Sequence, residues 1–369
     1  EADRSSARAT AADAQLSLAR WYAFENWQQL AEWATAMTEK NGSVSRFESA
    51  IEAIIAGDTA SLKSLLDEDA GLIRARSMRR HHSMLLHYVG ANGVEGYRQK
   101  SPANAVQILR LLLEAGAEAD AEADMYGGGS TTLGLTATSI WPAKAGVLVP
   151  LLETLLQAGA AIDHPRAAGN KQYAVVGCLH NGRPEAADFL ARHGAKLDLE
   201  GAAGVGRLDI VREFFNDDGS LKITATRRQM ELGFMWACEF GHTAVAGFLL
   251  NRGLHPDTLV DGMLGLHWAI IGGHMDTIQL LIGHKASLEI KNTYGGPALD
   301  AAFWAILNRD EVYRWPEAGV DYVQVIEALL KAGAEIEPGT LAWLAKQDSL
   351  SYQFKERLAD VLRHYGANS

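Results

Sequence analysis

The sequence is poor in cysteine and proline, with two cysteines, Cys178 and Cys238, and nine prolines among 369 residues. So few cysteines exclude a disulfide scaffold, and their apolar, helix-like surroundings favour buried free thiols in a reducing compartment. No apolar stretch reaches the roughly 18 residues that would suggest a membrane span, and Glu1–Arg4 does not begin a signal or transit peptide. We therefore expect a cytoplasmic protein with no membrane partner.

Positive charge is also scarce. The chain has 34 Lys and Arg against 45 Asp and Glu, a formal net charge of -11. This balance disfavours a broad surface for polyanions, so nucleic acid is not an expected partner. The hydrophobic fraction of 48% is that of a globular protein with a packed core throughout.

A short phrase recurs along nearly the whole chain. It consists of two or three aliphatic residues, a short polar step, Gly-Ala, then an aliphatic residue and an acid. A glycine after an apolar helical run is typical of a left-handed cap, because a residue without Cβ adopts that conformation at little cost. The phrase therefore predicts a helix end about every 33 residues. The predicted ends are Gly116, Gly159, Gly194, Gly219, Gly253, Lys285, Gly333 and Gly366.

A second phrase precedes several of these helix ends and marks a tight turn between two short helices. It is centred on Gly57, Gly182, Gly206, Gly241 and Gly273. Helix starts come before it, most plainly at Gly265–Ala269 and more loosely at Leu85–Val89. These phrases and their period resemble the ankyrin repeat from about Val44 to Gly366. The resemblance implies an all-α solenoid of about eight or nine helix-turn-helix modules with short turn-fingers.

The sequence divides into two parts under this resemblance. Residues 1–43 form a predicted N-terminal helical cap, with two helices joined at Phe24–Trp27 and Asn26 as an N-cap. They are similar to the leader helices of a bacterial group of ankyrin proteins. Residues 44–369 form the repeat array, with insertions near 90–104, 125–146 and 308–320. Because insertions in a solenoid map to loops that often form the binding face, we expect function there.

The resemblance also implies which residues line a concave groove, namely the turn-fingers and the two residues before each inter-helix turn. With residues from the insertions added, the predicted ligand-binding or partner-binding residues are Asn92, Tyr97, Tyr126, Ser139, Trp141, His180, Asn181, Glu239, Phe240, Asp261, Tyr294 and Trp304. Such a groove fits a small molecule or an apolar peptide side chain. The alternative is a groove that is merely solvated.

Other polar and aromatic residues receive structural interpretations. His87 and His267 match the histidine that, in the family, ties a helix start to a neighbouring finger. Asp300 is either an acceptor at a helix start or an acid directed into the groove.

Trp236 and Trp268 are expected to pack between helices. Trp141 and Trp315 lie inside insertions, where they either close the edge of a loop or cap a ligand. The basic run 79–82, Arg-Arg-His-His, is interpreted as a solvated turn.

Signatures of catalysis are nearly absent from the sequence. Metal-binding, nucleophile-elbow and phosphate-loop motifs are missing, so we expect neither a metal nor a cofactor. One constellation has acid-base potential: Glu95, Tyr97, Arg98 and Lys100, expected to face Trp141 and His180. If the protein is an enzyme, the candidate catalytic residues are Glu95, Arg98, His180 and Glu239. The same residues suit a polar protein interface.

We interpret the chain as a monomeric recognition module that binds a protein segment through the concave face and the inserted loops. The alternative is an enzyme or small-molecule binder whose pocket is formed by the inserted loops over the concave trough.

Overall fold

The computed structural model of the protein describes residues 10–164, 174–308 and 319–367. The chain divides into two compact units, Glu1–Lys196 and Leu197–Ser369. Most of the third predicted insertion, including Trp315, lies outside the described residues.

The chain begins with two short helices, α1 (Ala11–Trp21) and α2 (Trp27–Met37). The Asn26 side chain accepts a hydrogen bond of 3.0 Å from the Gln29 N–H, which confirms the predicted N-cap. Phe24, Ala19 and Leu30 form a small core of their own, against which Trp33 packs. The predicted helical pair is thus present, and its apolar residues are buried together.

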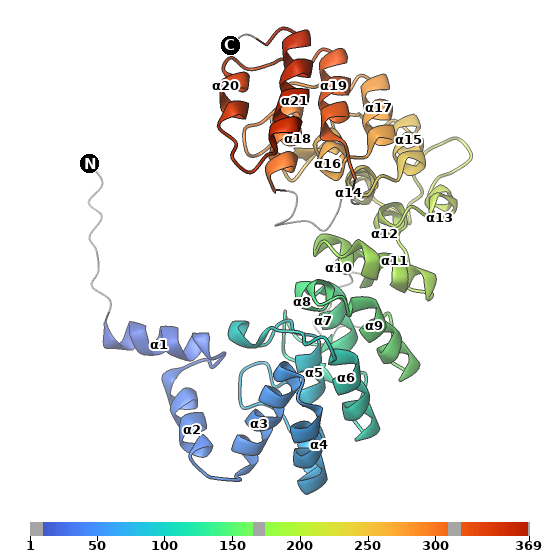
Figure 1. Ribbon diagram of the computed structural model, residues 1–369. Coiled ribbons are helices and arrows are strands. Elements are labelled where there is room, and N and C mark those ends of the chain that lie inside the picture. The colour runs from blue at the N-terminus through green and yellow to red at the C-terminus, as the bar shows by residue number, and fades with distance from the viewer. Residues whose placement is uncertain (1–9, 165–173, 309–318, 368–369) are drawn as a thin grey trace. The chain divides into compact units, whose positions relative to one another are not determined.

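The rest of the first unit consists of helix pairs. The helices, in chain order, are α3 (Ser43–Ala56), α4 (Thr59–Glu68), α5 (Leu85–Val89), α6 (Ala105–Glu114), α7 (Thr132–Thr138), α8 (Ile140–Lys144), α9 (Leu148–Gln157), α10 (Ala174–His180) and α11 (Pro184–Arg192). Short 3-10 turns, η1 (Ala70–Arg74) and η2 (Gly96–Arg98), lie in the connections. These helices form two layers (Figure 1). In one layer α3 packs on α5 and α5 on α7, and in the other α4 packs on α6 and α6 on α9. The end of the second predicted insertion is not a loop, since it forms α8.

The second unit repeats this arrangement. Its helices are α12 (Leu199–Gly204), α13 (Leu208–Glu213), α14 (Arg227–Glu239), α15 (Thr243–Asn251), α16 (Gly265–Gly272), α17 (Met275–Gly283), α18 (Ala298–Asn308), α19 (Tyr322–Lys331), α20 (Thr340–Ala345) and α21 (Tyr352–His364). Within this unit the inner layer runs from α12 through α14 and α16 to α18, and the outer layer pairs α13 with α15, α15 with α17 and α19 with α21. The fold is therefore all-α and built from helix pairs, as the sequence predicts.

Glycine places the turns of this repeat. Gly273 ends α16 with a φ of 72°, in the left-handed region that a Cβ disfavours. Gly116, after α6, has a φ of 94°. At the corresponding place after α17 the chain has Lys285, which adopts a φ of 63° without the help of a glycine. The predicted helix ends are confirmed at these positions.

Two fingers contain short antiparallel hairpins. In the first, β1 (Glu122–Ala123) pairs with β2 (Ser130–Thr131) so that Ala123 lies opposite Ser130. In the second, β3 (Leu259–Val260) pairs with β4 (Met263–Leu264) so that Val260 lies opposite Met263. Each hairpin leads directly into an inner helix, α7 or α16.

Buried aliphatic side chains between the two layers form the core. Both cysteines are free and buried there, and burial raises the pKa of the Cys178 thiol to about 12. The expectation of two buried thiols is confirmed. Every helix in the described parts of the chain is too short or too polar to cross a lipid bilayer.

Candidate functional site

The phrase histidines connect fingers to helix starts. The His87 ring is fully buried; its Nδ1 accepts a hydrogen bond from the Met84 N–H, and its Nε2 lies 2.9 Å from the Ala121 carbonyl oxygen. Burial lowers the pKa of His87 to about 4. A neutral ring therefore bridges α5 and the adjacent finger, which confirms a structural role. His267 accepts in the same way from the Leu264 N–H at 3.3 Å.

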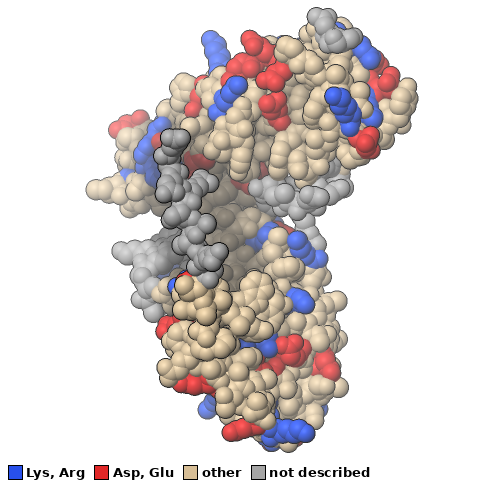
Figure 2. All heavy atoms as spheres, turned by 90° about the vertical axis from the view of Figure 1, so that its left-hand side faces the viewer, with Lys and Arg blue, Asp and Glu red and all other residues tan. Residues whose placement is uncertain are grey.

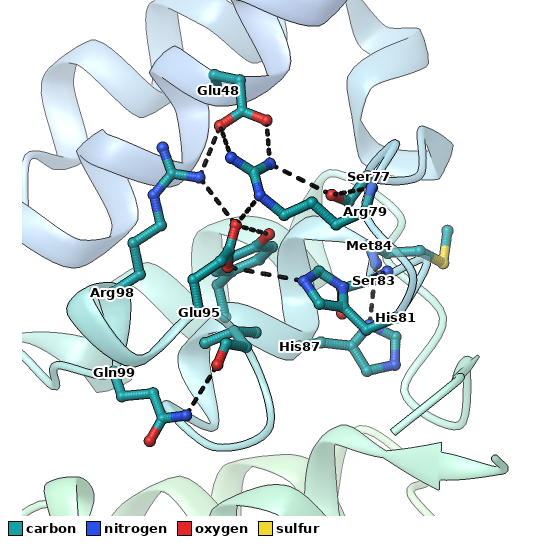
Figure 3. Close-up of polar contacts among 12 residues, drawn as sticks. Glu48, Ser77, Arg79, His81, Ser83, Met84, His87, Glu95, Arg98 and Gln99 are labelled. Carbon is teal, nitrogen blue, oxygen red and sulfur yellow. Dashed lines mark hydrogen bonds and ion pairs between the residues drawn. The ribbon is translucent and has the colours of Figure 1, made fainter. Parts of the chain in front are cut away.

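The basic run before α5 is solvated only at Arg80 and His82, which corrects the prediction for Arg79 and His81. Arg79 is 0% exposed, and His81 is also buried. The Arg79 guanidinium pairs with the carboxylates of Glu48 on α3 and Glu95 in the first insertion (Figure 3). A charge at this depth persists only where other groups compensate it, and two buried carboxylates do so here.

Glu95 and Arg98 belong to the same cluster. Arg98 donates to Glu48 at 2.6 Å and to Glu95 at 3.2 Å, and it reaches the partly exposed Glu52 at 2.6 Å. Burial by itself raises the pKa of Glu95, but the His81 ring and the charges of Arg79 and Arg98 outweigh burial and hold this pKa below its ordinary value. The expected orientation toward Trp141 and His180 is therefore wrong for Glu95 and Arg98, because Glu95 points at Arg79 and Arg98, and Arg98 points at Glu48 of α3 (Figure 3).

This cluster holds the first insertion against α3. The Glu48 and Glu95 carboxylates are each engaged by both arginines, and only the side chain of Glu52 reaches solvent. Tyr97, next to Arg98, packs edge-on against Tyr22 of the helical cap with 5.7 Å between ring centroids. The insertion is thus attached to α3 and to the cap.

Two predicted binding residues of the first unit, Tyr126 and Asn92, meet each other. The Tyr126 hydroxyl donates to the Asn92 side-chain oxygen at 2.6 Å, and the Asn92 amide donates to the Thr138 hydroxyl at 2.9 Å. Ser139 is buried and donates to the Ala91 carbonyl oxygen at 3.1 Å. Asn92 and Ser139 therefore join adjacent modules, while the Tyr126 ring remains 63% exposed.

The remaining predicted residues of the first unit lie at the surface. Trp141 on α8 is 37% exposed, and the Lys144 ammonium lies 5.5 Å from its ring centroid. His180 ends α10, and Asn181 follows it; both are exposed. The Asn181 amide donates back to the Gly177 carbonyl oxygen at 2.8 Å.

Glu239, in the second unit, is buried, unlike an acid exposed in a groove. It is the last residue of α14 and only 4% exposed, and its burial raises the pKa to about 8. Phe240 follows it and stacks on Trp236 with 6.0 Å between ring centroids. Trp236 is buried, as predicted, and donates to Glu200 at 3.0 Å. Trp268 is only partly buried.

The predicted finger residues of the second unit are exposed. Asp261 has a φ of 50° and accepts a hydrogen bond of 2.8 Å from Arg228. Tyr294 is 88% exposed at the tip of the following finger. Over the face drawn in Figure 2, Lys and Arg side chains in the described parts of the chain are scattered among Asp and Glu side chains.

A pocket of about 410 Å³ opens beside Trp304, between α18 and α20. It is lined by Leu299, Asp300, Phe303, Trp304, Leu307, Asn308, Glu335, Glu337, Pro338, Gly339, Thr340 and Trp343. Along α18 these residues recur at helical spacing on one side of the helix, and α20 with the loop before it supplies the opposite wall. The pocket therefore lies between neighbouring inner helices.

The lining combines aromatic rings with carboxylates. Phe303 and Trp343 are in contact, with ring centroids 5.0 Å apart, and Trp304 is 39% exposed. Burial raises the pKa of Asp300 above its ordinary value, and the negative charge of Glu337 adds to this effect. Asp300 lies in the first turn of α18 and also lines the pocket, so its position fits both roles considered for it.

The sequence analysis selected Trp304 for the concave groove and did not select Trp343, Glu335 or Glu337. A signal for the two glutamates was present, since they follow Gly333-Ala334 in the recurring phrase that ends in an aliphatic residue and an acid. In the described residues, no group of three or more His, Cys, Asp or Glu side chains is arranged to hold a metal ion.

Comparison with known proteins identifies the repeat. Residues 234–339 match the family model for ankyrin repeats in three copies. A solved structure of the human ASB11 ankyrin repeat domain is similar at a TM-score of 0.37 and 19% identity, covering 78% of this chain and 99% of that chain. No curated protein matches the chain. The family match includes α16 and α17, whose turn, finger and histidine were described above, so residues 234–339 consist of ankyrin repeats.

Proposed function

We propose that this protein is a recognition module that binds a segment of another protein, and that the pocket between α18 and α20 receives one side chain of that segment. Ankyrin repeats are in general protein-interaction modules. A fold alone names no ligand, so the proposal depends on the pocket. Its volume of about 410 Å³ lies in the ordinary range of binding pockets, and aromatic residues dominate binding energy at recognition surfaces.

The exposed aromatic residues support the same function. Trp304 is 39% exposed beside the pocket, and Tyr126 and Trp141 are 63% and 37% exposed in the first unit. Large apolar side chains left at a surface often mark protein-binding sites when they gather at a pocket. We propose that the first unit contributes a separate contact through Tyr126 and Trp141.

The supporting observations do not extend to catalysis. Glu95 and Arg98 are engaged in buried ion pairs, so their side chains are committed to the scaffold. We further propose that the protein acts as a monomer in the cytoplasm, where free buried thiols such as Cys178 and Cys238 stay reduced.

A peptide-display selection tests the proposed function. Random peptides are selected on the immobilised full chain, and the Kd of each winner is measured for the wild type and for Trp304→Ala. We expect winners whose affinity falls at least about tenfold in Trp304→Ala, the usual effect of removing a central aromatic anchor. Trp27→Ala is the control, because Trp27 is 42% exposed on the helical cap. Failure to select any peptide that depends on Trp304 would overturn the role of the pocket.

A further inference from the structure

The charged residues that line the pocket between α18 and α20 are all acidic. They are Asp300, Glu335 and Glu337, and neither Lys nor Arg is among the described residues of the lining. The Glu335 backbone N–H donates to Glu289 at 2.9 Å, so a fourth carboxylate lies close to this wall. Carboxylates gathered on one wall repel one another, and a positive group bound in the pocket would relieve that repulsion.

The pKa of Asp300 reflects both its burial and the charges around it. Burial is the largest cause of its raised pKa, and Glu337 and Glu289 both add to the shift, while Lys291 opposes it. Lys291 therefore does not outweigh burial and the two glutamates together, since the pKa remains above its ordinary value. A ligand cation placed near Asp300 would act in the same direction as Lys291 and lower this pKa.

The aromatic rings of the pocket can also attract a cation. Trp343 and Phe303 form one contact pair, and Trp304 offers a partly exposed indole to the same pocket. A cation within about 6 Å of an aromatic ring is attracted by the ring, most strongly by tryptophan. Arginine combines this attraction with a planar fork that pairs with carboxylates in two places at once.

We propose that the pocket between α18 and α20 binds the guanidinium group of an arginine side chain in the partner segment, between the indoles of Trp304 and Trp343 and the carboxylates of Asp300 and Glu337. This inference rests on the proposed function and adds the chemistry of the bound residue. Aromatic rings alone would suit any apolar side chain; the acidic lining selects a basic one.

The direct test uses two short peptides that differ only in charge. Acetyl-Gly-Arg-Gly-amide is compared with the same peptide containing citrulline, which has nearly the same shape and no charge. Binding is followed through the indole N–H signals of the full chain labelled with 15N-tryptophan, with Trp304→Phe and Trp343→Phe used to assign the two signals. We expect the arginine peptide to shift these signals and to bind at least about tenfold more tightly than the citrulline peptide.

Charge variants connect the effect to the pocket. Asp300→Asn and Glu337→Gln should each weaken binding of the arginine peptide about three- to tenfold. Glu327→Gln is the matched control, because Glu327 is an exposed acid on α19 outside the pocket. It removes the same charge and should leave the affinity within about twofold, since exposed charges farther apart than a Debye length are largely screened.

The outcomes separate this inference from the proposed function. Equal binding of the arginine and citrulline peptides, no binding of either, or equal weakening by Glu327→Gln would overturn the arginine site. Display-selected peptides that depend on Trp304 but contain no arginine would also overturn it while leaving the recognition function intact. If no selected peptide depends on Trp304, both proposals fail.

Discussion

Arg79 lies over Trp33, with the guanidinium carbon 4.9 Å from the ring centroid of the indole. Trp33 belongs to α2 in the helical cap, whereas Arg79 belongs to the connection before α5. The Trp33 indole N–H also donates to Glu48 at 3.1 Å, and Glu48 pairs with Arg79. One buried cation therefore joins the cap, α3 and the first insertion.

Arg79→Met should destabilise the protein by roughly 3–5 kcal/mol, because it leaves the buried carboxylates of Glu48 and Glu95 without their main partner. Urea unfolding measures this change. Arg80→Met is the control, since Arg80 is exposed and its loss should cost within about 0.5 kcal/mol. Equal effects of the two variants would contradict the buried network.

Because of Glu239, the free energy of unfolding should fall as the pH rises. Its pKa is about 8 in the folded protein against an ordinary value of 4.5, so the folded state binds more protons than the unfolded state between these values. Stability should decrease from about pH 4.5 to pH 8 and then level off. Glu239→Gln, which remains neutral, should be more stable than the wild type at pH 8 by up to a few kcal/mol, with a smaller difference at pH 5.

Urea unfolding at pH 5 and pH 8 tests this behaviour. Glu213→Gln, at an exposed position on α13, is the control and should show no such dependence. A Glu239→Gln effect of the same size at both pH values would show that the folded-state pKa of Glu239 is not raised.

Gly333→Val should cost on the order of 1–2 kcal/mol, because Gly333 has a φ of 101° and a branched Cβ disfavours that conformation. A Cβ at this position meets no neighbouring atom, so the cost is one of backbone conformation alone. Gly283 is the matched control: a Cβ there also enters open space, but its φ lies outside the left-handed range. Thermal unfolding should show a clear loss for Gly333→Val and little loss for Gly283→Val.

Truncation to alanine should have different effects on stability at Trp236 and at Trp304. Trp236→Ala should lose roughly 3–5 kcal/mol, because the side chain is buried and hydrogen-bonded to Glu200. Trp304→Ala should lose no more than about 1 kcal/mol, since Trp304 is 39% exposed, and should act on peptide binding instead. Thermal unfolding of both variants, measured alongside the peptide assay, distinguishes a core residue from a pocket residue. A larger loss for Trp304→Ala than for Trp236→Ala would contradict the assignment of Trp304 to the pocket wall.

The repeat itself was determined by the sequence. Helix ends at residues such as Gly116 and Gly333 depend on the conformation of one glycine and the few residues before it. His87 was likewise predicted to tie a helix start to a finger, and its hydrogen bonds to Met84 and Ala121 have that form. These features are legible because each is encoded over a short stretch of chain and recurs with the period of the repeat.

The clusters that unite distant segments were decided only by the tertiary structure. The sequence analysis placed Arg79 in a solvated turn and Glu95 opposite Trp141 and His180, and it did not select Glu48. Charged residue types are mostly exposed, and a single sequence does not show which of them meet. Trp343 and Glu337 likewise became part of a pocket only because α20 lies beside Asp300 and Trp304 of α18. Whether a charge is buried depends on how deeply its neighbours pack around it, and that depth is set by contacts between helices far apart in the chain.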